Sequence, residues 1–253
     1  MTQPQWVPDD LEAVSFEWRE PGIAWIRLNR PDAANARNQA MRRELLDLYA
    51  GIAADPDVRV VVLGAAGERH FCAGMDLKEA GGPETLAQQK ARLSQGRDID
   101  ILASLPVPTI AAVNGAAMGG GFEMALACDI RVVADTARIA LPEVKIGLVP
   151  GGGATQRLPL VVGYARAAEM ILLGDMLTGP EIVEAGLARR SVPVGDLDDA
   201  VAEVATAIAE KPPAAVRAAK DLLAASQRLP LDAGLGKELD TLLMLLQQRR
   251  DDA

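Results

Sequence analysis

Two glutamates stand out in the sequence because each lies next to a cluster of glycines. Glu123 follows Gly119, Gly120 and Gly121 closely, in a stretch that has no other charged residue between positions 100 and 129. Burying an unpaired carboxylate is costly, so a carboxylate kept in an apolar stretch is a candidate catalytic acid or base. The glycine amides beside it would let a substrate oxygen approach the backbone. The alternative is an ordinary acid in the first turn of a helix, favoured by the helix dipole.

Glu143 lies twenty positions later, after Pro142 and before a second glycine cluster at 151–153. It is the second candidate for acid or base chemistry. Taken alone, it could equally be a surface acid paired with Lys145 or Arg138. The segment 71–78 is weak evidence by itself, because Gly74 within it could serve only a turn.

Several kinds of chemistry are disfavoured by the same sequence. Gly119 does not begin a Gly-x-Gly-x-x-Gly fingerprint, since Met124 completes that spacing, and no Gly-Lys-Ser/Thr is present, so nucleotide chemistry is not expected. His70 is the only histidine and Cys72 and Cys128 are the only cysteines. We therefore expect no metal site, and we interpret both cysteines as buried thiols in a reducing compartment.

The elements that must position these residues follow from hydrophobic spacing. Strands at 13–18 and 23–28 are expected to form a hairpin around Pro21-Gly22, followed by a helix from about Gln39 that Asn38 caps. Buried strands are expected at 58–63 and 109–113, with one polar helix over about 84–103 between them. This alternation of strands and helices predicts an α/β fold.

The pattern changes after about residue 194, where helix follows helix and no strand signal returns. The last helix is apolar around much of its circumference over 239–246, which is more than a surface helix of a monomer needs. We interpret this face as buried at a subunit interface. The alternative is a helix that crosses its own core.

Composition places limits on partners and location. The chain has 253 residues, of which 49% are apolar, and its formal net charge is -9. That charge disfavours a nucleic-acid partner. The acidic N-terminal segment lacks the apolar core of a signal peptide, and the uncharged run at 101–122 is interrupted by prolines and glycines, so we expect a cytoplasmic protein without a membrane span.

Taken together and in order, four motifs resemble those of the enoyl-CoA hydratase/isomerase (crotonase) family. The matching segments are 29–31 with Asn35-Ala36, 71–77, 114–121 with Glu123 and Cys128-Asp129, and Pro142-Glu143 leading into 147–153 and 155–157. The resemblance implies a crotonase-like spiral of ββα units over residues 1–194, which contains the acyl-CoA site. A C-terminal helical trimerisation region over 195–253 would follow it. The assembly would be a homotrimer or a dimer of trimers.

The same resemblance implies an acyl-CoA substrate and no separate cofactor, because coenzyme A is part of the substrate. The thioester carbonyl oxygen would accept hydrogen bonds from the backbone N–H groups of Met75 and Gly120, which stabilise an enolate. The remaining substrate-binding positions implied by the resemblance are Ala73, Gly74, Asp76, Leu77, Lys78 and Gly119. Lys78 could equally be a solvated lysine.

The reaction implied by the resemblance is hydration of the 2,3 double bond of a 2-enoyl-CoA, as in family members with glutamates at both positions. Glu123 would orient and deprotonate water for attack at the β-carbon, while Glu143 would exchange the α-proton. Within the family the alternative is a double-bond isomerase or another acyl-CoA lyase that uses the same oxyanion hole. The alternative from a different functional class is a non-catalytic member of the family that binds acyl-CoA or RNA.

Two departures from the family pattern bear on the substrate. Arg37 follows Asn35-Ala36, where the family usually has an aliphatic residue, and we expect it to alter how that loop approaches the coenzyme. The sequence also ends at 247–253, where relatives commonly continue into a basic tail that covers the acyl-CoA site. We therefore expect a specialised substrate rather than general fatty-acid oxidation.

Overall fold

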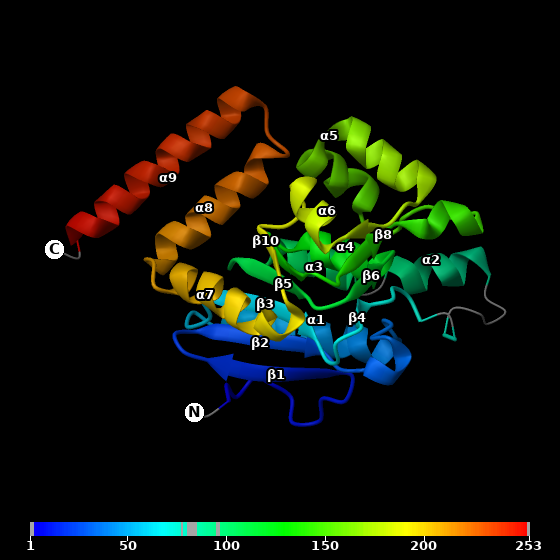
Figure 1. Cartoon of the computed structure of the whole chain (residues 1–253). Helices are drawn as coiled ribbons and strands as arrows, with labels where there is room; N and C mark the ends of the chain where they lie inside the picture. Colours follow the sequence, from blue (N-terminus) through cyan, green and yellow to red (C-terminus); the bar gives the residue numbers. More distant parts are fainter. Residues whose placement is uncertain (1–2, 77, 80–84, 95–96, 252–253) are drawn as a thin grey trace.

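A computed structural model describes residues 3–76, 78–79, 85–94 and 97–251 of the chain. Within these residues the strands form two sheets (Figure 1). The large sheet has the order β1 (Val14–Arg19), β2 (Ile23–Leu28), β3 (Val60–Ala65), β5 (Thr109–Val113), β7 (Ile130–Ala134) and β10 (Arg190–Val192). The small sheet has the order β4 (His70–Cys72), β6 (Ala116–Met118), β8 (Arg138–Ala140) and β9 (Leu177–Thr178).

The chain alternates between the two sheets, so that from β3 to β8 each strand of the large sheet is followed by a strand of the small one. Helices complete each turn of this spiral. The helices are α2 (Leu86–Ser94) and α3 (Asp98–Ser104) after β4, α4 (Gly120–Ala127) after β6, and α5 (Ala154–Leu173) after β8 and the 3-10 turn η2 (Pro142–Ile146). The expected ββα spiral is therefore confirmed, and consecutive helix starts are brought to the same part of the molecule.

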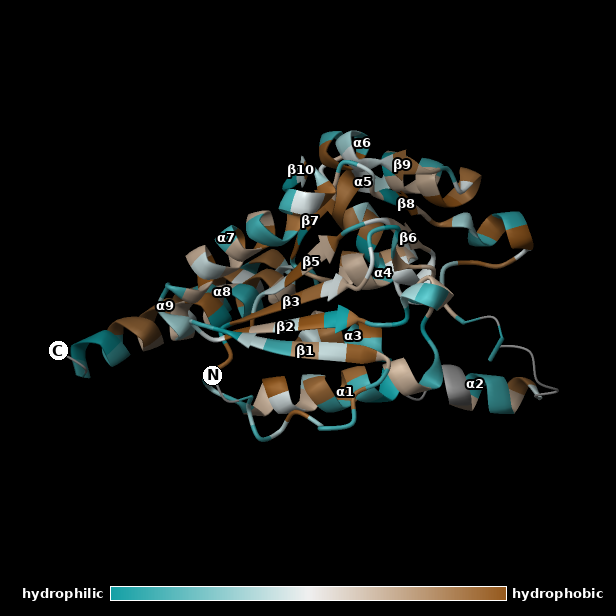
Figure 2. Ribbon diagram, turned by 60° about the horizontal axis from the view of Figure 1, so that its bottom comes forward, coloured by the Kyte–Doolittle hydropathy of each residue, from teal (hydrophilic) through white to brown (hydrophobic). Residues whose placement is uncertain are grey.

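The central strands β3 and β5 of the large sheet are buried on both faces. Along β3 every residue is buried, and successive side chains point to opposite sides of a strand. Val61 and Leu63 belong to a core cluster shared with α1 (Gln39–Ala54), whereas Val60 and Val62 belong to a second cluster shared with α7 (Leu197–Ala209). Figure 2 shows this hydrophobic strand inside the molecule, with α1 and α7 on different sides of the sheet.

Several expected elements are confirmed. β1 and β2 pair as an antiparallel hairpin, and β2 and β5 have the predicted bounds. The side chain of Asn38 accepts a hydrogen bond from the Met41 amide at 2.9 Å, as expected of the N-cap of α1. The two remaining predicted strands begin one and two residues later, at Val14 and Val60.

The prediction of one helix over 84–103 was wrong, because α2 ends at Ser94 and α3 begins separately at Asp98. The two helices have different environments. The first turn of α3 places Asp98 and Ile99 in the protein interior, while the described side chains of α2 are mostly exposed. A single straight helix would not combine these two environments. The short strands of the small sheet were also missed, since two or three residues carry no periodicity.

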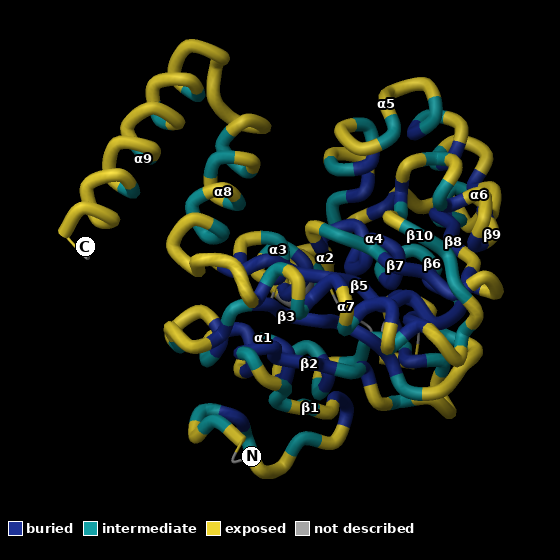
Figure 3. Tube along the Cα trace, turned by 60° about the vertical axis from the view of Figure 1, so that its left-hand side comes forward, coloured by how far each residue is buried: buried dark blue, intermediate teal, exposed yellow. Residues whose placement is uncertain are grey.

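The C-terminal helices are α8 (Pro213–Ser226) and α9 (Leu231–Asp251), preceded by α6 (Gly179–Glu184) and α7 in the main body. Figures 1 and 3 show α8 and α9 side by side, standing away from the two sheets. Seven large apolar side chains of α9 are exposed at 41 to 75%. They are Leu231, Leu235, Leu239, Leu242, Leu243, Met244 and Leu246. The alternative of a helix that crosses its own core is therefore contradicted, and the apolar face is uncovered in the single chain.

Among the described residues, we find no helix whose length and apolar character would let it cross a bilayer.

Candidate functional site

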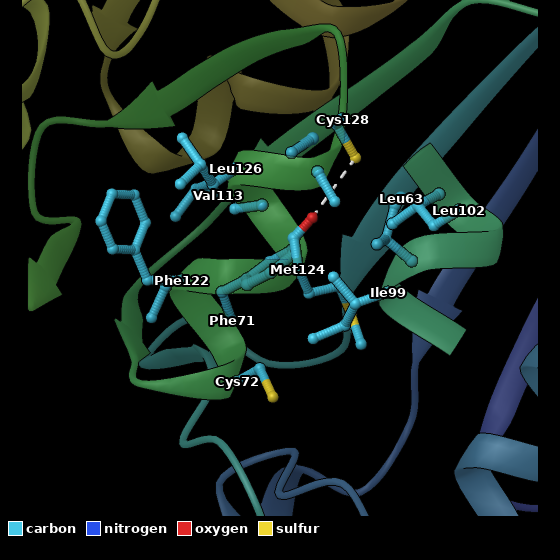
Figure 4. Packing of buried hydrophobic residues seen from close by; sticks show 14 of the residues in the cluster. Leu63, Phe71, Cys72, Ile99, Leu102, Val113, Phe122, Met124, Leu126 and Cys128 are labelled. Carbon is cyan, nitrogen blue, oxygen red and sulfur yellow. Dashed lines mark hydrogen bonds between the residues drawn. The ribbon is translucent and has the colours of Figure 1, made fainter. Parts of the chain in front are cut away.

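Glu123 lies in the first turn of α4, a helix buried on almost all sides. Its neighbours Phe122 and Met124 pack into the hydrophobic core seen in Figure 4, while Glu123 itself is only 3% exposed. Its Oε1 atom accepts hydrogen bonds from the amides of Gly152 at 2.7 Å and Ala154 at 3.0 Å. These amides lie at the start of α5, where the helix dipole stabilises a carboxylate. The carboxyl group is thus buried and directed by backbone donors.

Glu143 lies on η2 and approaches the same region from another side. A Cβ atom added at Gly119 would lie 2.8 Å from its Oε1 atom, and its Oε2 atom is buried without a hydrogen-bond partner among the described residues. Burial raises the pKa of Glu143, the charge of Glu123 raises it further, and a backbone hydrogen bond opposes the change. Lys145 forms its ion pair with Asp175 at 3.7 Å instead. The surface pairing considered for Glu143 is therefore not formed within the described chain.

The Met75 and Gly120 amides lie close together beside the two carboxylates. A Cβ atom added at Gly120 would lie 3.9 Å from the Met75 nitrogen, and one added at Gly74 would lie 3.3 Å from the Gly120 nitrogen. Neither amide donates a hydrogen bond to another group among the described residues. Two neighbouring N–H groups are thus left for an oxygen atom from outside the chain.

Glycine is required where α4 meets the small sheet. A Cβ atom added at Gly121 would lie 2.0 Å from the backbone oxygen of Cys72, a distance that no side chain tolerates. Gly74 has a φ of +94°, which favours glycine. The two backbone segments that carry the Met75 and Gly120 amides are therefore held in direct contact.

The other predicted binding residues support the loop around Met75. Asp76 is paired with Arg30 at 2.8 Å, and this hydrogen bond holds the pKa of Asp76 below its usual value. The amide of Lys78 donates to Asp76 at 3.1 Å, and Lys78 itself is exposed. Ala73 donates its amide to the carbonyl of Ala34 at 3.0 Å. Leu77 lies outside the described residues.

Two ion pairs at the site were not found from the sequence. Arg37, which stood out in the sequence only as a departure from the family pattern, forms an ion pair with the buried Asp98 at the start of α3. Arg157 donates to Asp100 at 2.7 Å and to the carbonyl of Gly152 at 2.8 Å. The available signal was the pair of acids at 98 and 100, which precedes the apolar residues of α3. The prediction of one continuous helix over 84–103 hid this signal, because it placed both acids in the middle of a helix rather than in a first turn.

Both cysteines are buried, as expected. Burial raises the pKa of Cys72 to about 11 and that of Cys128 to about 12. At neutral pH both are therefore thiols, which are poor nucleophiles. Among the described residues, no three histidine, cysteine or acidic side chains gather in a group that could hold a metal ion.

Comparison with known proteins gives a consistent result. Residues 19–251 match the profile of the enoyl-CoA hydratase/isomerase family. The chain is 37% identical to the (E)-benzylidenesuccinyl-CoA hydratase of Thauera aromatica, over 84% of this chain and 83% of that one. It is 34% identical to the short-chain-enoyl-CoA hydratase of Clostridium acetobutylicum, over 90% and 87% of the two chains. A crystal structure of an enoyl-CoA hydratase from Bacillus anthracis superimposes with a TM-score of 0.90 at 38% identity, covering 93% of this chain and 92% of that one.

Proposed function

The chain belongs to the enoyl-CoA hydratase/isomerase family, matched over residues 19–251, and on this premise we propose that it is an enoyl-CoA hydratase. The reaction adds water across the 2,3 double bond of a 2-enoyl-CoA thioester. One observation supports this proposal above the others. Glu123 and Glu143 lie close enough for the charge of one to raise the pKa of the other, and their environments differ.

The two environments suit two different roles. Glu123 has one oxygen held by the Gly152 and Ala154 amides, which fixes the orientation of its carboxyl group as a base requires. Burial raises the pKa of Glu143, which favours the protonated form needed by an acid. In hydration, Glu123 takes a proton from water as the water oxygen bonds to the β-carbon. Glu143 delivers its proton to the α-carbon, and proton exchange with solvent then restores both groups.

The oxyanion hole of this proposal consists of the Met75 and Gly120 amides. Attack at the β-carbon moves the π electrons of the double bond toward the thioester oxygen, which becomes enolate-like. The two amides have no other acceptor among the described residues, so both can donate to that oxygen. Fixed backbone donors of this kind stabilise a developing charge because they need no reorientation during the reaction.

The test follows the ultraviolet absorbance of crotonyl-CoA, which falls as the conjugated double bond is hydrated. Glu123→Gln and Glu143→Gln keep the side-chain size and remove the ionisable group, so each should lower kcat about 100-fold or more. Glu44→Gln is the matched control. Glu44 is also buried and accepts from two amides, those of Ala13 and Val14, at 3.0 Å, but it lies on α1 outside the site. Its variant should retain full activity.

The isomerase alternative gives a different result in the same set of variants. Moving a double bond from the 3,4 to the 2,3 position needs a proton taken from one carbon and returned to another, which a single carboxyl group can do. A Glu123→Gln variant that isomerises 3-hexenoyl-CoA as well as the wild type, in a protein that does not hydrate crotonyl-CoA, would replace our proposal with this one.

We also propose that the apolar face of α9 is covered by other copies of the chain in a homotrimer or a dimer of trimers. The exposed leucines of α9 form a surface that is unfavourable in water. The Thauera and Clostridium relatives are named for different acyl groups, so their names do not identify the acyl group that this chain prefers. The residues around the site bear on that preference.

A further inference from the structure

Arg37 is a partly buried cation beside the proposed oxyanion hole. Its side chain is 11% exposed and that of Asp98 is 2% exposed. Two of the three guanidinium nitrogens, Nε and Nη2, donate to the Asp98 carboxylate, with the Nε contact at 3.2 Å. This two-point pairing fixes the plane of the guanidinium and leaves Nη1 directed elsewhere.

The Nη1 atom lies beside Gly120. A Cβ atom added at Gly120 would lie 3.0 Å from Nη1 and 3.9 Å from the Met75 nitrogen. The guanidinium is therefore a near neighbour of both amides of the oxyanion hole. Nη1 makes no hydrogen bond to a described residue, and it is not among the buried atoms that lack a partner, so it is still in contact with solvent.

A substrate that fills the site would remove this solvent. An acyl group made only of hydrocarbon would leave the N–H groups of Nη1 buried without an acceptor, which is unfavourable. An acyl group with its own carboxylate would supply an anionic acceptor to a donor already held in place by Asp98. A site with a fixed polar donor discriminates strongly against a ligand that lacks the matching group.

We propose that Arg37 is a specificity-determining residue whose Nη1 atom binds a second carboxylate on the acyl group. The preferred substrates are then 2-enoyl-CoA thioesters of dicarboxylic acids. Because Nη1 lies next to Gly120, whose amide binds the thioester oxygen, the second carboxylate belongs to a short acyl chain. This inference rests on the proposed function, since it assumes that the thioester occupies the hole at Met75 and Gly120.

The experiment measures binding of saturated esters, which cannot be hydrated, by isothermal titration calorimetry. Glutaryl-CoA and adipyl-CoA are compared with pentanoyl-CoA and hexanoyl-CoA, which have the same chain lengths without the second carboxylate. For at least one pair, the wild type should bind the dicarboxylic ester about 10- to 100-fold more tightly, the range of a charge-assisted hydrogen bond. The double variant Arg37→Leu/Asp98→Asn removes both charges and should abolish this preference.

Two further variants separate recognition from folding. Arg37→Lys keeps a charge beside Asp98 but lacks the planar fork, so it should also lose most of the preference even if the double variant does not fold. Arg27→Leu/Asp198→Asn removes another two-point ion pair, a more exposed one between β2 and α7, and should keep the preference. Folding of each variant is checked by circular dichroism and thermal unfolding.

The outcomes distinguish this inference from the proposed function. Equal wild-type binding of both ester classes would overturn the inference alone and leave an acyl-CoA site. Equal weakening of both classes in the Arg37 variants would also overturn it, because Arg37 would then only position the oxyanion hole. Failure of all four esters to bind would overturn the acyl-CoA site itself, and the inference with it.

Discussion

Asp98 and Asp100, two residues apart in the first turn of α3, bind arginines that contact two different segments of the site. Asp98 is paired with Arg37, beside Gly120, and Asp100 is paired with Arg157, which also donates to the carbonyl of Gly152. The Gly152 amide in turn donates to Glu123. One helical turn therefore connects the proposed oxyanion hole with the loop that orients the proposed base.

This relationship predicts that Arg157 is a positioning residue for Glu123. Arg157→Leu should release the Gly152 backbone and lower kcat for crotonyl-CoA by roughly 10- to 100-fold, because small misplacements of a catalytic group are costly. KM should change much less, since Arg157 does not contact the proposed thioester site. Steady-state kinetics give both values, and Arg157→Lys should recover part of kcat.

The matched control is Arg166→Leu, which breaks an exposed ion pair with Glu169 on the same helix, α5. It should leave both kcat and KM at wild-type values. A rise in KM without a fall in kcat for Arg157→Leu would contradict the positioning role and indicate a direct contact with substrate.

A second prediction concerns stability at Glu143. Because burial and the charge of Glu123 raise the pKa of this carboxyl in the folded state, the folded protein favours its protonated form. The wild type therefore loses stability relative to Glu143→Gln as pH rises from below 4.5 through the raised pKa. Chemical unfolding of the two proteins should show the Gln variant to be the more stable at pH 7.5, with the difference shrinking at pH 4. A less stable Gln variant at neutral pH would contradict the raised pKa.

The same raised pKa predicts opposite pH dependences for the two directions of the reaction. Hydration needs Glu143 protonated, so the hydration rate should fall as pH rises through its pKa. Dehydration of 3-hydroxybutyryl-CoA needs the carboxylate, so that rate should rise over the same interval. Initial rates in both directions across a pH series provide the measurement. Parallel profiles in the two directions would rule out Glu143 as the group that exchanges the α-proton.

The sequence alone predicted the elements that have a long apolar run or are bounded by a clear turn signal. β3 is buried along its whole length, and the hairpin of β1 and β2 turns at Pro21-Gly22 as expected. The short strands β4, β6, β8 and β9 could not be predicted in this way. They are held by pairing with one another, which depends on contacts between distant parts of the chain rather than on local pattern.

The site was predictable to a similar extent. Glu123 was noticeable because its charge is isolated in an apolar stretch, and the structure buries it. The roles suggested for Glu123 and Glu143 remain predictions until the variants are measured. The acids at 98 and 100 were visible in the sequence, but their pairing with Arg37 and Arg157 could not be foreseen, because these partners are 61 and 57 residues away. Nothing in local spacing identifies such partners.

A third structural feature, the close contact of Gly121 with Cys72, predicts a large effect of one methyl group. Gly121→Ala would place a Cβ atom 2.0 Å from the Cys72 oxygen. The resulting shift should lower the free energy of unfolding by about 2 kcal/mol or more. Gly234→Ala is the control, because it lies in α9 with nothing within 4 Å of the added Cβ, and should be neutral or stabilising. Urea unfolding measures the free energy of unfolding of both variants. Equal changes in the two variants would contradict the predicted clash at Gly121.

The exposed apolar face of α9 leads to a prediction about the oligomeric state. Leu242→Glu/Leu246→Glu should convert the proposed assembly into single chains, because both side chains are exposed in the chain alone and charges there would oppose burial. Size-exclusion chromatography with light scattering measures the mass directly. Leu86→Glu, at an exposed leucine of α2, should leave the mass unchanged. A wild type that is already monomeric would contradict the proposed trimer.

The two donors at Met75 and Gly120 are both main-chain amides, and this has a consequence for how the protein can evolve. A main-chain N–H does not titrate in the working range of an enzyme, so the hole would impose no pH limit, and any such limit would come from the two glutamates. At position 75 only proline would delete the donor. Since Met75 is 41% exposed, other side chains can replace it and alter the fit of a substrate while the backbone donors of the oxyanion hole are kept.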